Sequence, residues 1–567
     1  MDARLKFLFI AFSLLFLMLF NGTLFSQERI RVSYLPLQNS SIDSSGNVKA
    51  VTAGKVHMMA ETLRDYSSLI ETFVPEKEYI SLPGKKYYRL AEMPHHKIYH
   101  SETLSRDSLF TYTSKTDTIN GYYCKHAKRV IFSNTVDFWY APALPLPATP
   151  YPSLGVLPGA VMKVVVNGSY GYQAIEVEEQ KGGVALPEHW GEEVSREEYS
   201  ARLAENHVKT ISLFEEVKLS FGNPIENPMA TDTDSVYHYS KGTVALRKLK
   251  LPDLPDHTVF LKLIEKANGD AYDRTGSVFL IDPNGHLSFL NALRDSVEVL
   301  PSFSDNEGRT YHGFRKTAHY HPPVELLRFF TPFGVGHFND KRTVKGLQWK
   351  DSVLYEQDVT SAIRAFAGME VWIGAYIANY DKGGHIVSLS LDYHPESQKR
   401  KDEQPEFFAE NLFNTLNILE MSGQQYSRLF RNDTLCVDFE VPEGLSSLQL
   451  RYISTGHGGW GGGDEFNQKI NRIFIDGKEV FSFIPWREDC SAFRSWNPAS
   501  GNFWNGISSS DLSRSGWCPG GATNPEYINL EHLEPGHHTI EIVIPAGPPA
   551  GNSFSAWNVS GLLIGEF

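Results

Sequence analysis

Residues 268–285 read NGDAYDRTGSVFLIDPNG, which places a polar loop, a strand and a turn in succession. The β-branched and aromatic run at 277–281 ends in a Pro-Asn-Gly turn signal, and this pattern predicts a strand. Directly before the strand stand an acid and a base, Asp273 and Arg274. A carboxylate at the start of a strand is held on a rigid element and stays open to substrate, as a general base must be. Local sequence alone favours a plainer interpretation, because an Asp-Arg pair is more often a turn former or a surface ion pair.

Short strand-like runs of this kind recur on both sides of the stretch. They predict an all-β chain in which two consecutive antiparallel units suggest paired jelly rolls or β-sandwiches, preceded by an additional mostly-β N-terminal domain. A length of 567 residues leaves room for about three or four domains. The clearest runs are residues 30–34, 87–91, 97–100, 259–264, 371–376, 387–391, 448–453, 473–475 and 539–544.

The composition is that of a globular protein with an excess of acidic residues. A hydrophobic fraction of 41% supplies enough material for buried cores. The formal net charge is -14, and no sustained Lys/Arg run occurs, which argues against nucleic acid or an anionic membrane surface as a partner. Aromatic residues make up 13% of the chain, a fraction that suits β-structure and also stacking against sugar rings. The expected oligomeric state is a monomer.

The N-terminus has the pattern of a secretory signal peptide, predicted at residues 1–26. Arg4 and Lys6 precede an apolar run at 7–20, which small and polar residues follow. This run is too short to predict a stable membrane span. We therefore expect an exported protein, periplasmic or secreted, with no membrane span in the mature chain.

Four cysteines remain after this segment. With so few, disulfide bonds can form but do not build the scaffold. Cys124 and Cys436 stand in apolar strand contexts, where buried free thiols are the default expectation.

Residues 27–206 form the predicted N-terminal domain. The segments Ile119-Asn120-Gly121-Tyr122-Tyr123-Cys124-Lys125 and Gly155-Val156-Leu157-Pro158-Gly159-Ala160-Val161 resemble the GLPGLI-type family of secreted β domains, which implies a fold but no activity. Near the end of the domain, Ser195-Arg196-Glu197-Glu198 is a capping box, so a linker helix is expected to begin there and to run to about residue 208.

Two more motifs lie in the last third of the chain. The first is STGHGGWGGGDEF, residues 454–466. Its glycines allow the backbone to approach a ligand closely, and Trp460 offers a flat apolar face. A mobile surface loop is the plainer interpretation of such a stretch, and a phosphate loop is excluded because no Gly-Lys-Ser/Thr follows. The second motif is SRSGWCPG, residues 513–520.

Together with the aromatic-Asp-Arg triplet at Tyr272-Asp273-Arg274, these motifs resemble those of the peptide N-glycosidase F family. The Ser-Arg and Trp-Cys-Pro-Gly run is the most specific of them. The resemblance extends over residues 209–567 and includes Phe330-Thr331-Pro332-Phe333 and Asp358-Val359-Thr360. It implies two jelly rolls, at 207–394 and 395–567, and an amidase that removes whole N-glycans from N-glycoproteins or N-glycopeptides and converts the linking asparagine to aspartate.

The resemblance also implies a role for each matching residue. Cleavage of a glycosylated asparagine amide needs a carboxylate that positions and deprotonates water, and donors that stabilise the developing oxyanion. Asp273 matches the principal catalytic residue of the family, and Glu465 matches its second carboxylate. No metal and no organic cofactor is required. The remaining positions implied for the site are Tyr272, Arg274, Tyr376, Trp460, Arg514 and Trp517 for substrate binding, and Cys490 with Cys518 for a disulfide.

The sequence departs from the family at one acidic position. The third acid of the family aligns with Gly374. A glycine at this position implies a wider cleft, so we expect tolerance of extra substituents on the innermost sugar, such as a core fucose.

Three other functions remain open at this point. His319 and His321 lie on one face of a predicted strand, with His337 farther on, and paired jelly rolls also occur in copper monooxygenases. The following Pro322-Pro323 breaks that strand, which favours histidines without a metal. A glycoside hydrolase would also use two carboxylates, and a noncatalytic glycan-binding protein would use the same aromatic residues.

Overall fold

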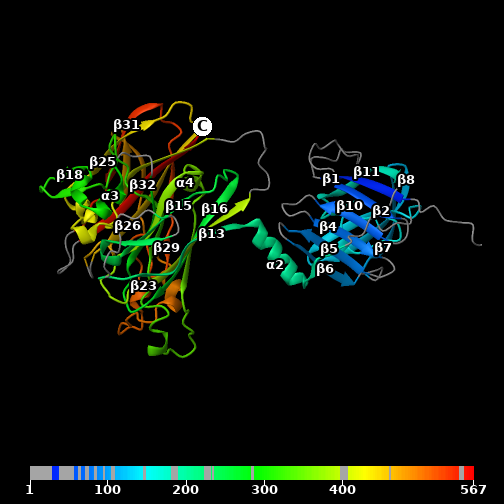
Figure 1. Ribbon diagram of the computed structural model, residues 1–567, viewed down its shortest axis with the longest axis horizontal. Coiled ribbons are helices and arrows are strands. Elements are labelled where there is room, and N and C mark those ends of the chain that lie inside the picture. Colours follow the sequence, from blue (N-terminus) through cyan, green and yellow to red (C-terminus); the bar gives the residue numbers. More distant parts are fainter. Residues whose placement is uncertain are drawn as a thin grey trace, which may run out of the picture. The chain divides into compact units, whose positions relative to one another are not determined.

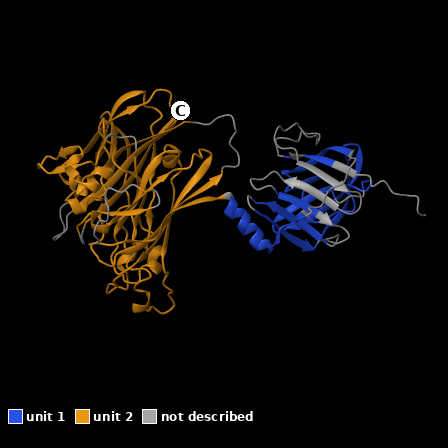
Figure 2. Cartoon of the chain, viewed as in Figure 1, with its two compact units in different colours: residues 1–207 blue, residues 208–567 orange. Residues whose placement is uncertain are grey.

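The structure is a computed structural model in which fifteen ranges of the chain are described. These ranges are residues 29–37, 56–61, 65–70, 76–81, 86–93, 96–103, 109–144, 148–180, 189–222, 232, 235–282, 287–395, 406–458, 462–547 and 555–567. The predicted signal peptide and the Pro-Asn-Gly turn at 283–285 lie outside them. The chain divides into two compact units, Met1–His207 and Val208–Phe567, coloured separately in Figure 2. Within the described ranges, no helix is long and apolar enough to cross a membrane.

The first unit is built on one sheet of twelve strands, in the order β12-β6-β5-β4-β3-β2-β1-β11-β10-β9-β8-β7. Neighbouring strands pair antiparallel, except for the parallel pair of β12 and β6. Cys124 is buried in the core of this unit as a free thiol. The strands are β1 (Arg29–Leu37), β2 (Val56–Glu61), β3 (Asp65–Ile70), β4 (Glu76–Ser81), β5 (Lys86–Glu92), β6 (Lys97–Thr103), β7 (Thr111–Ile119), β8 (Tyr122–Ile131), β9 (Asn134–Ala141), β10 (Ala160–Val166), β11 (Tyr170–Gln180) and β12 (Glu192–Glu193).

Helix α2 (Arg196–His207) ends the first unit. The predicted N-terminal cap is present, because the amide of Glu198 donates to Ser195 Oγ at 3.1 Å. Tyr199 anchors the helix: its ring is buried, and its hydroxyl donates to Glu76 at 2.9 Å. The predicted linker helix is therefore confirmed as a helix, and it packs against the first unit.

The second unit begins with two antiparallel sheets that enclose one apolar core. Both faces of the strands are covered, since β17 and β22 are buried along almost their whole length. The sheets have the strand orders β13-β23-β16-β21 and β14-β15-β22-β17-β20-β29. Their strands are β13 (Lys209–Leu219), β14 (Val236–Tyr239), β15 (Val244–Lys250), β16 (His257–Ala267), β17 (Thr275–Ile281), β20 (Val324–Phe330), β21 (Val353–Asp358), β22 (Glu370–Ile377) and β23 (His385–Pro395), while β18 (Ser302–Ser304) and β19 (Thr310–His312) form a separate hairpin.

A second pair of antiparallel sheets follows and encloses its own core. In Figure 1 its strands run from yellow to red. The sheets have the orders β24-β32-β26-β30 and β25-β31-β27-β28, which confirms an all-β fold with two successive antiparallel sandwiches after an additional β unit. The strands are β24 (Phe407–Asn414), β25 (Leu435–Val441), β26 (Ser447–His457), β27 (Asn471–Ile475), β28 (Lys478–Phe483), β30 (Glu526–Asn529), β31 (Gly536–Val543) and β32 (Ala556–Glu566).

One short strand, β29 (Ala522–Thr523), joins the two sandwiches. It follows the SRSGWCPG motif in the chain, yet it pairs with β20 at the edge of the first sandwich's sheet. This pairing brings the preceding segment, with Arg514 and Trp517, close to the loop that carries Asp273. Short helices fill the connections: η2 (Pro152–Leu154), η3 (Ser240–Gly242), α3 (Phe289–Arg294), η4 (Val297–Val299), η5 (Asn339–Lys341), α4 (Thr360–Arg364), η6 (Glu420–Ser422), η7 (Tyr426–Arg431), η8 (Cys490–Trp496) and η9 (Ser509–Asp511).

A buried polar network also links the two sandwiches. Glu325 on β20 pairs with Arg328 at 2.7 Å, and both side chains are completely buried. Arg328 donates to Asn558 O at 2.6 Å, and Ser560 on β32 donates to Glu325. Charges without water need all of their hydrogen-bond partners, so this network fixes how the two sandwiches pack.

Ser560→Ala should lower the free energy of unfolding by about 1.5–3 kcal/mol, because it removes a hydrogen bond to a buried charged group. Chemical denaturation measures this change. The matched control is Ser482→Ala on the exposed side of β28, which should change stability by less than about 0.5 kcal/mol. Equal effects of the two substitutions would contradict the role given to the network.

Candidate active site

The loop that carries Asp273 is held by its backbone. Thr331, directly after β20, donates through its hydroxyl to Tyr272 O at 3.0 Å and accepts from the amide of Arg274 at 2.8 Å. The amide of Thr331 also donates to Arg274 O at 2.9 Å. The backbone on both sides of Asp273 is thus fastened to the neighbouring strand, so the position of this carboxylate does not depend on its own side-chain contacts.

A buried ion network also holds the loop that carries Asp273. Asp270 accepts from Arg274 Nε at 2.7 Å, and His385 Nε2 lies 3.6 Å from it. His385 Nδ1 is 2.8 Å from Glu265. Although burial opposes protonation, the two carboxylates raise the pKa of His385 to about 9. His385 and Arg274 together hold the pKa of Asp270 at about 2 against the effect of burial.

Glu465 stands on a loop that its neighbour anchors. Asp464 is fully buried, and it accepts from Trp557 Nε1 at 2.8 Å and from the amide of Gly547 at 2.9 Å. Its carbonyl accepts from Ser515 Oγ at 2.6 Å. The Asp464 side chain therefore points into the core, and the adjacent Glu465 points the other way, toward the Asp273 loop.

Arg514 joins the two carboxylates. Its Nε donates to Glu465 Oε1 at 3.0 Å, and its Nη2 lies 3.7 Å from Asp273 Oδ2. The two carboxylate side chains keep 19% and 20% of their surface exposed, whereas the Arg514 side chain keeps 2%. The three groups come from residues 273, 465 and 514, which are far apart in the sequence.

The guanidinium of Arg514 is fixed on every side. It donates to Leu512 O and Ser509 O at 3.0 and 2.9 Å, and it lies 4.9 Å from the centroid of the Trp517 ring. Trp517 in turn stacks on Phe330 of β20 at 4.2 Å. The disulfide between Cys490 and Cys518 closes this segment. All of these contacts hold the cation where both carboxylates can share it.

Burial changes the acidity of both carboxylates. It raises the pKa of Asp273 and of Glu465 above the ordinary carboxylate range, although Arg514 opposes the shift in each case. For Glu465, the negative charge of Asp273 adds to the increase. One cation between two carboxylates therefore leaves a site that readily takes up a proton, as general acid-base catalysis requires.

Three of the residues that the resemblance implies for substrate binding are buried in this structure. Tyr376 is 2% exposed, because β22 is buried on both faces, and its hydroxyl donates to Asn417 O. Trp517 and Arg514 are 3% and 1% exposed. In this structure both side chains are buried: Arg514 contacts the two carboxylates, and Trp517 packs against Arg514. Trp460 lies outside the described residues.

Tyr272 and Arg274 do lie at the surface beside Asp273. Tyr272 is 62% exposed, and the Arg274 guanidinium lies 4.9 Å from the centroid of its ring. On the other side Arg274 faces Tyr380, which is 51% exposed, at 5.9 Å. Tyr380, Asp270 and His385 were not among the site residues predicted from the sequence. No local pattern marked any of the three, because a spacing of four residues indicates an ion pair only on a helix and Asp270 and Arg274 lie on a loop.

The expected widening at Gly374 is wrong. A Cβ atom at this position would lie 2.2 Å from Leu246 Cδ2 and 3.0 Å from Phe279 Cζ, so packed side chains fill the space. On β22 the residue also lies four positions before Ala378, where the strand reaches the Asp273 loop, a separation of about 13 Å. Gly374 therefore belongs to the core and does not line the cleft.

The histidines that were considered as metal ligands do not form a cluster. Among the described residues, no three His, Cys, Asp or Glu side chains are grouped as a metal ion would need. His319 is exposed, and His321 lies 3.6 Å from Asp282.

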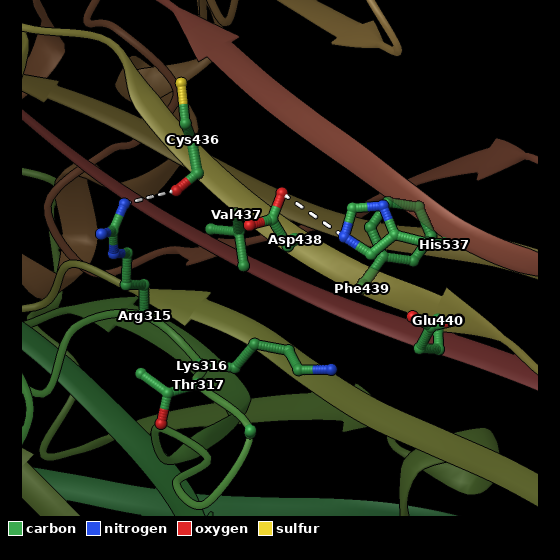
Figure 3. A pocket seen from close by; sticks show the side chains of 10 residues that line it. Arg315, Lys316, Thr317, Cys436, Val437, Asp438, Phe439, Glu440 and His537 are labelled. Atoms are coloured by element: carbon green, nitrogen blue, oxygen red, sulfur yellow. Dashed lines mark hydrogen bonds and ion pairs between the residues drawn. The ribbon is translucent and has the colours of Figure 1, made fainter.

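A pocket of about 470 Å³ lies away from the carboxylates, between the loop at 315–318 and strand β25, as Figure 3 shows. Charged side chains that line it have partners of their own, and that of Lys316 is Glu410 at 2.6 Å. Arg315 donates to Cys436 O at 2.8 Å, and His537 lies 3.9 Å from Asp438. Cys436 is a half-buried free thiol. This pocket contains neither Asp273 nor Glu465.

Three family models match the chain. One described as peptide-N-glycosidase F, N terminal, matches residues 210–393, and one described as peptide-N-glycosidase F, C terminal, matches residues 425–564. The first unit matches a model described as N-glycanase peptide, N-terminal domain, over residues 32–194. No protein with a curated description matches the chain.

Two solved structures agree with these matches. A structure of PNGF-II in space group P21 shares 37% identity with this chain, covers 95% of this chain and 99% of its own, and superposes with a TM-score of 0.80. Its C2 crystal form gives 38% identity, 95% and 98% coverage, and a TM-score of 0.73. PNGase F from Flavobacterium meningosepticum, described as a glycosylasparaginase, shares 18% identity, covers 63% of this chain and 96% of its own, and gives a TM-score of 0.42.

Proposed function

The chain belongs to the peptide-N-glycosidase F family, and on this basis we propose that it is a peptide-N4-(N-acetyl-β-glucosaminyl)asparagine amidase. It cleaves the bond between an asparagine side chain and the innermost sugar of an N-glycoprotein or N-glycopeptide. The observation that carries this proposal is the pair of mostly buried but still accessible carboxylates, Asp273 and Glu465, which share the buried Arg514. Two acids of raised pKa beside one cation suit hydrolysis of an amide.

Asp273 acts as the general base in this proposal. It takes a proton from a water molecule as the water oxygen attacks the carbon of the asparagine amide. The carbon-nitrogen bond then breaks, the nitrogen receives a proton and leaves with the sugar, and the asparagine becomes aspartate. Glu465 holds the water or the substrate as the second carboxylate. Arg514 balances the charge of both acids, and Arg274 lies beside Asp273 at the surface.

Mass spectrometry of a short N-glycopeptide after incubation with the protein tests the proposal. The expected products are the whole glycan and a peptide in which the linking asparagine has become aspartate. A sugar left on the asparagine would instead indicate a glycoside hydrolase. An intact glycopeptide would favour a noncatalytic glycan-binding protein. The packed surroundings of Gly374 give no support to acceptance of a core fucose.

The pH dependence follows from the raised pKa of Asp273. A general base must be ionised, so kcat/KM should rise with pH through that raised pKa and should reach its plateau above the range of an ordinary carboxylate, about 4. Glu465→Gln should move the acidic limb toward lower pH, because it removes a neighbouring negative charge. A pH profile of each protein measures this. An acidic limb near pH 4 that does not move in the variant would contradict the role of Asp273 as a buried base.

We also propose that the protein is exported to the periplasm or beyond. The N-terminal pattern supports this, and so does the Cys490–Cys518 disulfide, because such bonds persist in oxidising compartments. The domain boundaries at 27–206, 207–394 and 395–567 are proposed as well. The matched ranges 32–194, 210–393 and 425–564 support them.

A further inference from the structure

A short hairpin beside the active site carries the most exposed tryptophan among the described residues. In this hairpin, residues 501–508, Trp504 is 98% exposed. Phe503 and Ile507 on either side keep 37% and 42% of their surface exposed. Several apolar side chains that share one small exposed area mark a surface where another molecule binds more often than an isolated exposed residue does.

The hairpin does not need Trp504 for its own shape. The amide of Phe503 donates to Ile507 O at 2.8 Å, and the amide of Gly506 donates to Phe503 O at 2.9 Å. Gly506 has φ +81°, which a glycine adopts without strain. Because backbone contacts hold the turn and the indole ring contacts almost nothing, the ring is presented outward by a preformed loop.

The base of the hairpin is fastened to the catalytic groups. The amide of Ser509 donates to Gly501 O at 2.8 Å, and Ser509 O accepts from Arg514 Nη2 at 2.9 Å. Arg494 pairs with Asp511 and donates to Asn502 Oδ1 at 3.2 Å. Trp504 follows Asn502 by two residues, so its backbone lies about 10–15 Å from the Arg514 guanidinium in an extended hairpin. At this distance the ring lies beyond direct contact with the catalytic groups, so a part of the substrate that contacts it is an outer part, remote from the bond that is cleaved.

The chemistry of the tip favours sugar rings as that outer part. An indole ring offers a flat apolar face of the kind that packs against the C–H face of a sugar. Two uncharged amides flank it, and each is oriented by its oxygen: Asn502 Oδ1 accepts from Arg494, and Asn505 Oδ1 accepts from the amide of Ile507 at 3.0 Å. The NH2 group of each side chain can therefore donate to the hydroxyl oxygens of a sugar.

We propose that Trp504 and its hairpin form a subsite for the outer sugars of the N-glycan. This inference rests on the proposed function and adds the part of the substrate that the hairpin contacts. It assigns a binding role to a segment that the sequence motifs did not mark.

Binding to a catalytically impaired form, Asp273→Ala, tests the subsite without turnover. Calorimetry compares two glycopeptides with the same peptide, one carrying a branched N-glycan and one trimmed to its two innermost sugars. Adding Trp504→Ala should raise the Kd of the branched glycopeptide about tenfold and leave that of the trimmed one unchanged. Phe132→Ala is the matched control, since Phe132 is also 98% exposed but belongs to the first unit.

Equal weakening for both glycopeptides would overturn the inference, because it would place the peptide or the innermost sugars at Trp504. An unchanged Kd for both, or no binding of the branched glycopeptide before Trp504 is changed, would overturn it as well. Failure of the proposed function would give a different result. The unsubstituted protein would release no glycan from the branched glycopeptide, although Trp504→Ala would still raise the Kd of that glycopeptide.

Discussion

Asp273→Asn is expected to lower kcat by about 10³-fold or more, because an amide cannot accept the proton of the attacking water. The change keeps the size of the side chain. The loop should stay in place, since Thr331 holds the backbone on both sides of the residue through contacts of 2.8–3.0 Å. Initial rates on a short N-glycopeptide, with the peptide product identified by its mass, give the size of the loss.

The matched control for this change is Asp489→Asn. Asp489 loses the same charge in the same unit, but it pairs with Arg487 and its side chain is 58% exposed. Its rate should stay within about twofold, because exposed ion pairs contribute little. Thermal unfolding should show that both variants are folded. If Asp273→Asn retained most of the activity, the base would have to be another group, and Glu465 would be the first to examine.

Arg514→Met should reduce both activity and stability. Removal of the guanidinium leaves Glu465 and Asp273 without their shared cation in a largely buried place, and loss of one partner from a buried ion pair costs about 3–5 kcal/mol. The two acids then repel each other and hold protons more tightly. The acidic limb of kcat/KM should therefore move to higher pH, which a purely structural loss would not cause.

Arg514→Lys separates charge from geometry. A lysine keeps the positive charge but cannot donate at once to Glu465, Leu512 and Ser509, because its ammonium is a compact group on a flexible stem. We expect the acidic limb to stay near its original pH while kcat falls by about tenfold to a hundredfold. Arg472→Met is the control, since Arg472 is half exposed and 3.6 Å from Glu479. It should cost less than about 0.5 kcal/mol. An unmoved limb in Arg514→Met would contradict the electrostatic role.

Short-range patterns in the sequence were sufficient for many of the strands and for one helix, whereas the family motifs were needed to single out the acids. Runs of β-branched and aromatic residues predicted the strands β16, β17 and β26, and Ser195 with Glu198 predicted where α2 begins. The same reasoning placed Asp273 at a strand entrance, and the family motifs pointed to Glu465 and Arg514. All of this information lies within a few residues of each position, because turn signals, caps and motifs are local.

The surroundings of those acids were decided by contacts between distant segments. The pairing of β29 with β20 brings Arg514 to Asp273, and no pattern within either strand encodes it. Tyr376 and Gly374 proved to be core positions, because β22 is buried on both faces and its apolar run cannot show which side meets solvent. His385 and Glu265 lie 120 residues apart. Local sequence and the family motifs together pointed to Asp273, Glu465 and Arg514, whereas the packing of the sheets determined their distances, their burial and hence their acidity, since both burial and charge coupling depend on neighbours that only the folded chain assembles.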